Sequence, residues 1–244
     1  VDRKKYFKLN FTHSGRVAFR RFSDKNAQAK FFCTLIAGHK SCKHALELYS
    51  KRVQIIRYFE AHHPDYFEFF GVGWDKHTFS GGLGARVLNR FTWLRKKMAP
   101  KFLTYRGMVN KKLECLQNYK FSICYENAKE IPGYITEKIF DSMAAGCIPV
   151  YWGAPNIQQY VPEECFVDRR QFKSDADLVS YLLQMRESEY DSRLNAIASY
   201  LESQAHRLFE PEAVAEMVAH DIVGHAKQYS ALSSQTTSGG VRAT

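Results

Sequence analysis

The sequence predicts an α/β fold with a Rossmann-like parallel sheet covered by helices on both faces. Short apolar runs typical of buried strands alternate with longer segments whose apolar residues recur at helical spacing. The 244 residues, 45% of them hydrophobic and 25% charged, suit a globular domain with a large core. Such a sheet binds ligands at the carboxyl ends of its strands, where helix N-termini also point.

The apolar runs define the predicted strands, which are 31–37, 66–71, 119–125, 147–151 and 165–167. The predicted helices are 43–62, 109–118, 134–145, 175–186, 188–203 and 212–228. Residues 72–104 are glycine-rich and predict a loop with one basic helical turn near 92–98. Pro149 lies in the fourth predicted strand, and because proline cannot donate to a ladder it predicts a strand end or a sheet edge.

Three segments follow from this pattern. Residues 1–28 are basic and weakly patterned, and we expect an N-terminal segment or linker remnant. Residues 29–228 form the predicted Rossmann-like domain, and the Ser/Thr/Gly-rich residues 229–244 predict a disordered tail. The chain opens on Val1 in a charged stretch, so we expect the parent protein to begin upstream. No apolar run reaches the roughly 18 residues that a transmembrane helix needs.

The formal net charge is +10, which attracts anionic partners such as nucleic acid, anionic lipid headgroups and nucleotide-sugars. The basic residues form short scattered clusters, which are usually solvated surface. A basic nucleic-acid-binding module is one reading of this charge. Against it, the sequence contains no recognised nucleic-acid motif, and its aromatic residues lie in apolar runs.

The six cysteines form no C-x-x-C pair, so the sequence indicates neither a zinc knuckle nor a redox motif. Cys33, Cys124 and Cys147 lie in apolar runs and are predicted to be buried thiols, which favours a reducing compartment. Asp175-Ala176-Asp177 has the spacing of a metal-binding D-x-D triplet, but it falls at a predicted helix start, where carboxylates favour the helix dipole. We therefore expect no cofactor and no obligatory metal.

Residues 119–155 are the most informative segment. A buried strand is followed by Glu126-Asn127, and a loop then leads into a helix whose first turn holds Glu137 and Lys138. A nucleotide-sugar fits this arrangement, because its diphosphate needs free backbone N–H groups and a cation, and its ribose needs an acceptor such as Glu137. Each residue also has a purely structural reading: Lys138 as surface, Glu137 as a dipole partner, and Asn127 as a turn former.

The strings YKFSICYEN, GYITEKIFD and GCIPVYWGAPNI resemble the signature of the α1,3/α1,4-fucosyltransferases, glycosyltransferase family 10. Weaker similarity extends upstream through Tyr105-Arg106-Gly107 and Lys111 to Arg52, and downstream through FVDRRQFKSDADLVSYLLQM, so it covers roughly residues 30–205. The resemblance implies the C-terminal, donor-binding half of a GT-B glycosyltransferase. The implied reaction is inverting transfer of L-fucose from GDP-fucose to a hydroxyl of an acceptor glycan.

The resemblance also implies the site. The expected substrate-binding residues are Arg52, Asn127, Tyr134, Glu137 and Lys138. Arg52 and Lys138 would contact the diphosphate, and Glu137 the ribose or fucose hydroxyls. Weaker candidates are Tyr105, Arg106, Glu126 and Trp152. The family's general base lies in the acceptor-binding half, so we expect the base outside this chain, and residues 1–244 to bind GDP but transfer fucose slowly or not at all.

The expected partners are GDP-fucose as the donor, an acceptor oligosaccharide or glycoconjugate, and a membrane surface in peripheral association. The expected location is the cytoplasm or the inner membrane of a bacterium, or else the lumenal side of the Golgi membrane. Two alternatives stay open, since fold does not fix substrate: a GT-B glycosyltransferase with a different nucleotide-sugar, and a non-catalytic nucleotide-binding module.

Overall fold

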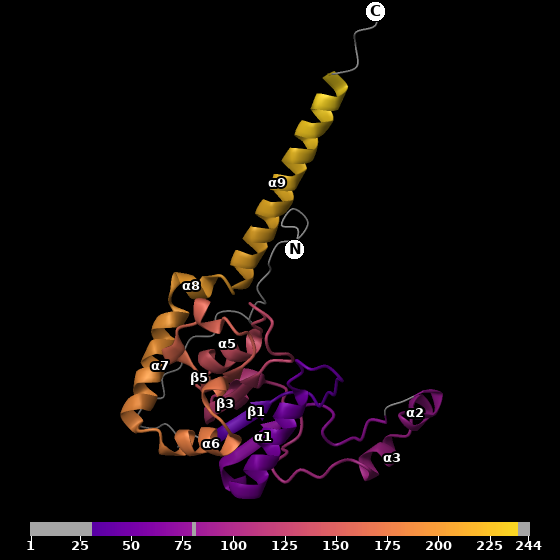
Figure 1. The fold of residues 1–244 in the computed structure, drawn as a ribbon, viewed down its shortest axis with the longest axis vertical. Helices are drawn as coiled ribbons and strands as arrows, with labels where there is room; N and C mark the ends of the chain where they lie inside the picture. The colour runs from indigo at the N-terminus through magenta and orange to yellow at the C-terminus, as the bar shows by residue number, and fades with distance from the viewer. Residues whose placement is uncertain (1–30, 80–81, 239–244) are drawn as a thin grey trace, which may run out of the picture.

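The computed structural model describes residues 31–79 and 82–238 of the chain (Figure 1). The predicted basic segment 1–28 and residues 239–244 lie outside the described residues. Among those described, no helix is both long and apolar enough to cross a membrane.

The core is a five-stranded sheet in the order β2-β1-β3-β4-β5, with every neighbouring pair parallel. The strands are β1 Phe31–Ile36, β2 Phe67–Phe70, β3 Tyr119–Tyr125, β4 Ile148–Trp152 and β5 Val167–Asp168. The predicted parallel sheet is therefore confirmed, with each predicted strand overlapping an observed one. The apolar runs identify these strands well because consecutive residues are buried in β1, β3, β4 and β5, as in parallel strands covered on both faces.

The direction in which successive strands are added to the sheet reverses between β1 and β3: β2 lies on one side of β1, and β3, β4 and β5 follow on the other. Helix α1, Tyr49–His62, carries the chain from β1 outward to β2, whereas α5, Glu137–Ala144, carries it from β3 the other way to β4. Because such crossovers are right-handed, helices that run in opposite directions lie on opposite faces of the sheet. The carboxyl ends of β1 and β3 thus form the topological switch point, where open α/β sheets bind ligands.

The remaining helices complete the two faces. Helix α6 packs beside α1, whereas α4 and α7 pack beside α5. Their bounds are α2 Leu83–Leu88, α3 Thr92–Lys97, α4 Lys112–Leu116, α6 Asp175–Gln184, α7 Glu187–Leu201, α8 Gln204–Arg207 and α9 Pro211–Ser238. The prediction of helices on both faces is confirmed. Figure 1 also shows α9 extending far above the sheet, and α2 and α3 standing away from it to the right.

Several helices begin or end away from the predicted residues. Helix α1 begins at Tyr49 and not at residue 43, because the Glu47 carboxylate accepts the Ser50 N–H at 2.9 Å and fixes the first turn there. Helix α5 begins at Glu137 and not at residue 134, because Thr136 is extended. Helix α2 lies within the predicted loop 72–104. The backbone of residues 229–238 is helical, as the end of α9, where the sequence predicts disorder.

Pro149 lies near a strand end and not at a sheet edge: it is the second residue of β4, so the first alternative of the prediction is confirmed and the second is wrong. Strand β4 lies between β3 and β5. Strand β5, however, pairs only with Val150 and Tyr151 of β4. Pro149 lies outside that paired stretch, so its missing N–H leaves no ladder bond to β5 unmade. The neighbouring prediction of buried thiols is confirmed, since Cys33, Cys124 and Cys147 are all buried.

Candidate functional site

A cleft of about 460 Å³ opens at the carboxyl ends of β1, β2 and β3, at the switch point of the sheet. Its lining includes residues 36–38, 71–72 and 108–110. The polar side chains that line it are Lys40, Arg52, Asn110, Lys112, Asn127, Glu137 and Lys138. Four of the five principal candidates predicted from the sequence therefore lie around one cavity.

Arg52 enters the cleft from the first turn of α1 and is only 3% exposed. Its Nη2 donates to the Tyr125 carbonyl at 2.6 Å and to Asn127 Oδ1 at 3.0 Å, and its Nε donates to the same carbonyl at 3.2 Å. Burial lowers the pKa of Arg52, although the nearby charge of Glu126 opposes that shift. Because both hydrogen-bond acceptors are neutral, the guanidinium charge is available to an anion in the cleft.

Asn127 joins Arg52 to Tyr134. While its Oδ1 accepts from Arg52, its Nδ2 donates to the Tyr134 hydroxyl at 3.3 Å. Its carbonyl accepts the Leu48 N–H at 3.1 Å, which ties the loop after β3 to the start of α1. Burial raises the pKa of Tyr134. Three candidates from distant segments are thus held in one hydrogen-bond network.

Glu126 acts behind the cleft and not within it. The side chain is fully buried, with Oε1 accepting the Thr136 N–H at 2.8 Å and Oε2 accepting the Thr136 hydroxyl at 2.7 Å. Thr136 is the N-cap of α5, so a carboxylate brought from β3 satisfies one of the free N–H groups at this helix start. Gly153 leaves room for it, since a Cβ there would come within 2.5 Å of Glu126 Cγ.

Lys138 is held by this same carboxylate. Its Nζ lies 3.1 Å from Glu126 Oε2 and 2.8 Å from Thr136 Oγ1, and its side chain is 17% exposed. A lysine ammonium has three N–H donors, and these two contacts use two of them. Since Lys138 also lines the cleft, the third donor can serve a ligand oxygen. Glu137 lies beside it, with Oε1 3.8 Å from Nζ.

Two cations of the cleft were missed by the sequence reasoning. Lys112 lies 2.8 Å from the buried Asp141 and 4.0 Å from Glu137. Its neighbour Lys111, which carries part of the family resemblance, instead pairs with Glu114 on the exposed surface. Lys40 follows β1 and lines the opposite wall. The only sequence signal for Lys112 was the Lys111-Lys112 pair itself. The rotation of the chain at the start of α4 decides that Lys112, and not Lys111, faces the cleft.

Three weaker candidates lie outside the cleft lining. The Tyr105 hydroxyl donates to the Gly71 carbonyl at 2.7 Å and so supports the cleft wall from behind. Arg106 forms an ion pair with Glu68 at 2.7 Å on the outer surface. The Trp152 ring packs edge-on against Tyr125, with 5.5 Å between ring centroids. Each of the three has a structural partner that occupies its polar or aromatic group.

The carboxylates of Asp175 and Asp177 lie at the start of α6, as predicted, and both are used within the fold, although only Asp177 caps the helix. Ser174 and Asp177 form a reciprocal capping box at the start of α6. Asp175 pairs with Arg169 at 2.9 Å and accepts from Gln54 at 2.7 Å. In the part of the chain that the structure describes, no group of three or more His, Cys, Asp and Glu side chains is placed to hold a metal ion.

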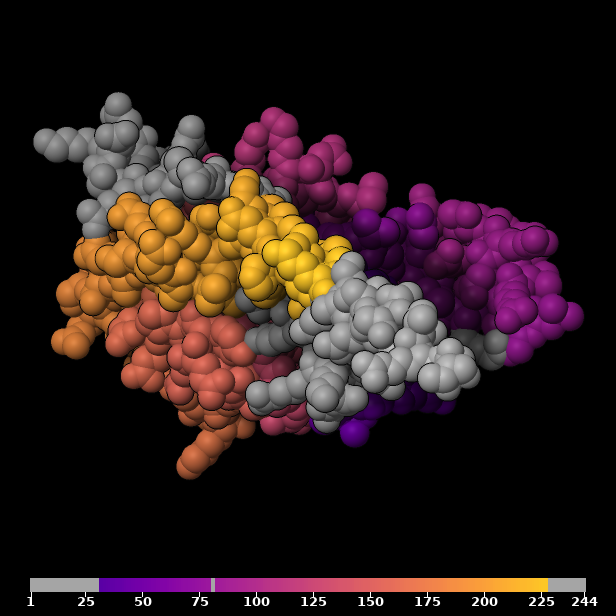
Figure 2. Space-filling view, turned by 90° about the horizontal axis from the view of Figure 1, so that it is seen from above, coloured from indigo at the N-terminus to yellow at the C-terminus, as the bar shows by residue number. Residues whose placement is uncertain are grey.

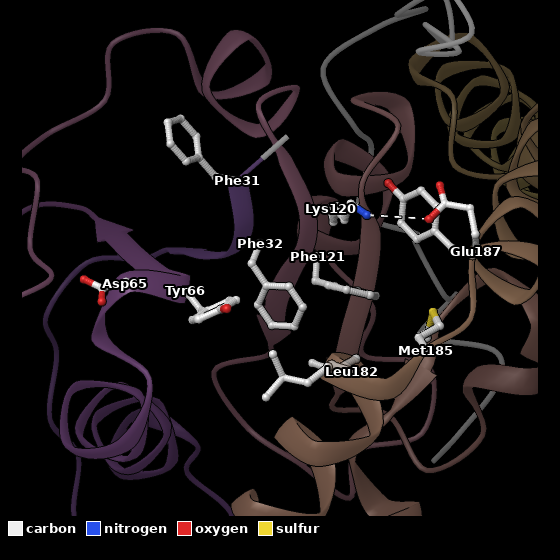
Figure 3. A pocket seen from close by; sticks show the side chains of 11 residues that line it. Phe31, Phe32, Asp65, Tyr66, Lys120, Phe121, Leu182, Met185 and Glu187 are labelled. Atoms are coloured by element: carbon white, nitrogen blue, oxygen red, sulfur yellow. Dashed lines mark ion pairs between the residues drawn. The ribbon is translucent and has the colours of Figure 1, made fainter. Parts of the chain in front are cut away.

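A second cavity of about 450 Å³ lies at the other end of the sheet, at the amino ends of β1, β2 and β3 (Figure 3). Its walls are mainly aromatic and aliphatic, from Phe31, Phe32, Tyr66, Phe121, Leu182, Leu183, Met185 and Tyr190. Lys120 and Glu187 face each other at 3.9 Å, as the dashed line in Figure 3 marks. No predicted site residue lines this cavity.

The arrangement at the carboxyl ends suits a diphosphate. Arg52, Lys138, Lys112 and Lys40 surround one cavity, against Glu137 as the carboxylate in its lining. Glycine backbone at Gly38 and Gly71 brings two strand ends close together, since a Cβ on Gly71 would lie 1.8 Å from the Ala37 carbonyl oxygen. Cations and close backbone approach are what phosphate recognition needs.

Comparison with known proteins agrees with this chemistry. A family model described as glycosyltransferase family 10 (fucosyltransferase), C-terminal, matches residues 98–229. An alpha-(1,3)-fucosyltransferase of Helicobacter pylori is 38% identical over 74 residues, which are 30% of this chain and 15% of that protein. An alpha-(1,4)-fucosyltransferase of Arabidopsis thaliana is 37% identical over 71 residues, 29% of this chain and 18% of that protein.

Among solved structures, an alpha1,3-fucosyltransferase with GDP-fucose is 24% identical, with a TM-score of 0.45 over 68% of this chain and 38% of that chain. The aligned segments thus span less than a fifth of the two curated relatives and well under half of the solved chain. The family model, by contrast, matches more than half of this chain. The chain belongs to glycosyltransferase family 10, the fucosyltransferases, and carries the C-terminal region of that family.

Proposed function

We propose that the cleft binds the GDP moiety of GDP-fucose and that the chain supplies the donor site of an inverting fucosyltransferase. Membership of the fucosyltransferase family supports the reaction class. The observation that carries the site is the meeting of Arg52, Asn127 and Lys138 around one cavity at the switch point of the sheet. These residues come from the start of α1, the loop after β3 and the start of α5.

The proposed role of the cations follows from the chemistry of glycosyl transfer. The bond between the fucose anomeric carbon and the phosphate oxygen breaks as the acceptor oxygen bonds to that carbon, and GDP leaves with the electron pair. Positive charge fixed at the phosphates lowers the barrier by stabilising the charge that builds there. Arg52 and Lys138 would supply this charge, with Lys40 and Lys112 adding to the field. Glu137 would hold a ribose or fucose hydroxyl.

The acceptor hydroxyl must lose its proton to a base during the attack. Glu126 is unsuited to that task, because it is fully buried and already accepts from Thr136 and Lys138. We expect the base outside residues 1–244, so that this chain alone binds GDP but transfers fucose slowly. The acceptor would be an oligosaccharide or glycoconjugate, and the working location the cytoplasmic face of a membrane or the Golgi lumen.

Titration calorimetry of the chain with GDP, UDP, ADP, GDP-mannose and GDP-fucose tests the proposal. We expect GDP and GDP-fucose to bind, and UDP and ADP to bind at least tenfold more weakly. The reason is that contacts with the guanine base, and not only the charge of the diphosphate, should set the affinity. Equal affinity for UDP would favour a glycosyltransferase of another specificity. No binding of any nucleotide would overturn the donor-site assignment. We also expect a chelator to leave the GDP affinity unchanged.

A further inference from the structure

An exposed arm separates β2 from α4 and contains α2 and α3. We define the basic arm as residues 82–103. Figure 1 shows its two helices well away from the sheet, and Figure 2, seen from above, shows this purple segment at the right-hand end of the molecule. The arm is anchored at its base, where the Phe102 ring packs edge-on against Trp74, with 5.3 Å between centroids, and under the Arg57 guanidinium at 3.9 Å.

The charge of the basic arm is of one sign. It contains no Asp or Glu, and its basic residues are Arg86, Arg90, Arg95, Lys96, Lys97 and Lys101. Within the described residues, none of these six side chains forms an ion pair. Arg95 donates only to neutral groups, the His77 carbonyl and the Thr78 hydroxyl. The positive charge of this arm is therefore uncompensated within the described chain.

The same arm exposes an unusual share of large apolar side chains. They are Leu83 at 78%, Trp93 at 66%, Leu103 at 73%, Met98 at 51%, Val87 at 48%, Phe91 at 47% and Leu88 at 38% exposure. An exposed concentration of apolar groups marks an interaction surface. Here it coincides with the unpaired cations, so the partner must offer both negative charge and apolar volume.

We propose that the basic arm docks on the surface of an anionic phospholipid bilayer. Short helices that combine Lys and Arg with Trp, Phe and Leu bury their apolar side chains at the boundary of headgroups and acyl chains, while their cations meet anionic headgroups. Tryptophan in particular favours the membrane interface. A nucleic acid would use the cations and stack bases on aromatic rings, but five of the seven exposed apolar side chains are aliphatic and gain nothing from stacking.

The arm joins the rest of the chain at the cleft. Val72, which follows β2 ahead of the arm, and Met108, which lies between the arm and α4, both line the cavity at the carboxyl ends of the strands. Docking of the arm would therefore hold this cleft close to the bilayer surface. The docking itself needs no nucleotide, so it stands or fails independently of the proposed donor site.

Sedimentation of the full chain with vesicles tests the proposal. We expect binding to vesicles of phosphatidylcholine with phosphatidylglycerol, and at least tenfold weaker binding to phosphatidylcholine alone. The double variant Lys96→Glu/Lys97→Glu should lose at least tenfold in affinity for the anionic vesicles. Trp93→Ser, which leaves the net charge unchanged, should weaken binding severalfold through the apolar contact. Lys173→Glu/Arg186→Glu makes the same charge change at exposed sites outside the arm and should bind nearly as well as the unaltered chain.

Circular dichroism of each variant checks the fold, which these exposed substitutions should leave intact. Equal losses in the arm variant and the distant charge variant would overturn the proposal, because net charge alone would then explain the binding. So would unchanged binding of the arm variants, which would assign the effect to basic residues elsewhere. Tighter binding to a single-stranded oligonucleotide than to anionic vesicles, lost in Lys96→Glu/Lys97→Glu, would identify the arm as a nucleic-acid surface instead.

Discussion

The two ends of the sheet carry cavities of nearly equal volume, about 460 Å³ at the carboxyl ends and about 450 Å³ at the amino ends, yet their chemistry differs completely. The carboxyl end gathers four cations around glycine backbone. The amino end gathers aromatic and aliphatic side chains with one Lys–Glu pair. The two cavities therefore differ in their polar groups and in what supports those groups, and not in volume.

The ion pairs at the two ends show how this support works. Lys138 and Glu126 lie 3.1 Å apart with side chains 17% and 0% exposed, whereas Lys120 and Glu187 lie 3.9 Å apart with side chains 38% and 75% exposed. A buried carboxylate that also caps a helix fixes the position of its lysine. An exposed pair is free to separate, because water solvates both charges almost as well. Pre-organised charge is thus confined to one end of the sheet.

The largest effect should come from Glu126→Ala. This change leaves Lys138 and the Thr136 hydroxyl without their buried acceptor, and breaking a buried ion pair typically costs about 3–5 kcal/mol. The matched change at the amino end, Glu187→Ala, should alter the free energy of unfolding by less than about 1 kcal/mol. Urea denaturation measures both. Similar losses in the two variants would erase the distinction drawn between the pairs.

A smaller effect is expected on nucleotide binding from Lys138→Met. Loss of one charged hydrogen bond to the diphosphate should weaken GDP binding by about 1–3 kcal/mol in calorimetry. Lys120→Met, at the amino end, should leave the GDP affinity unchanged. If GDP bound to Lys138→Met as tightly as to the unaltered chain, Lys138 would have no place in the site.

The Lys138→Met variant also leaves the buried Glu126 carboxylate without its cation. Weaker GDP binding would then have a second explanation, a less stable fold, besides the lost contact between Lys138 and the diphosphate. The double variant Lys138→Met/Glu126→Gln removes that charge and should recover part of the stability without recovering GDP affinity. Recovery of both would show that the lysine acts only through the fold.

Asn127→Ala should have a milder effect. It removes one acceptor from Arg52 and the donor to Tyr134, and a typical hydrogen bond contributes about 0.5–1.5 kcal/mol. We expect GDP affinity to fall several-fold, because Arg52 keeps its contacts with the Tyr125 carbonyl. Asn118→Ala, at the amino end of β3, is the matched control and should leave calorimetry with GDP unchanged. A larger loss in the control than at Asn127 would contradict the network described here.

The smallest effect should come from Glu68, which forms an ion pair with Arg106 outside the cleft lining. Burial pushes the pKa of Glu68 up, but hydrogen bonds from Tyr119 and Arg106 outweigh it and leave that pKa below its ordinary value. A carboxyl with a lowered folded-state pKa adds stability above its unfolded pKa and loses it as the pH falls through the folded value. Glu68→Gln should therefore flatten the loss of stability between pH 5 and pH 3, by less than about 1 kcal/mol.

Thermal unfolding across this pH range measures the Glu68 effect. Glu114→Gln, which removes the exposed partner of Lys111, provides the comparison. An equal flattening in Glu114→Gln would mean that the part-buried hydrogen bond from Tyr119 to Glu68 has no special role. Unchanged GDP binding in Arg106→Ala would complete the argument that this arginine serves the outer surface.

Much of the fold follows from local patterns. The strand at 119–125 is predicted to the residue, and the helix stop at Gly146 agrees with its φ of +68°. These features depend on neighbours a few positions apart, such as alternating burial, capping and turn conformation, which a sequence displays directly. The resemblance in the strings around Asn127 and Lys138 likewise pointed to the carboxyl end of the sheet, where these two residues line the cationic cleft.

Other features depend on partners far apart in the chain. Arg52 meets Asn127 across 75 positions, and Glu68 meets Arg106 across 38. No local pattern could show that Glu126 turns inward to hold Lys138, that Lys112 and not Lys111 faces the cleft, or that Trp152 packs against Tyr125. The sequence by itself determined the elements and the family of this protein. The tertiary structure decided which charges face the cleft, because strand order and helix rotation bring together groups that the chain holds apart.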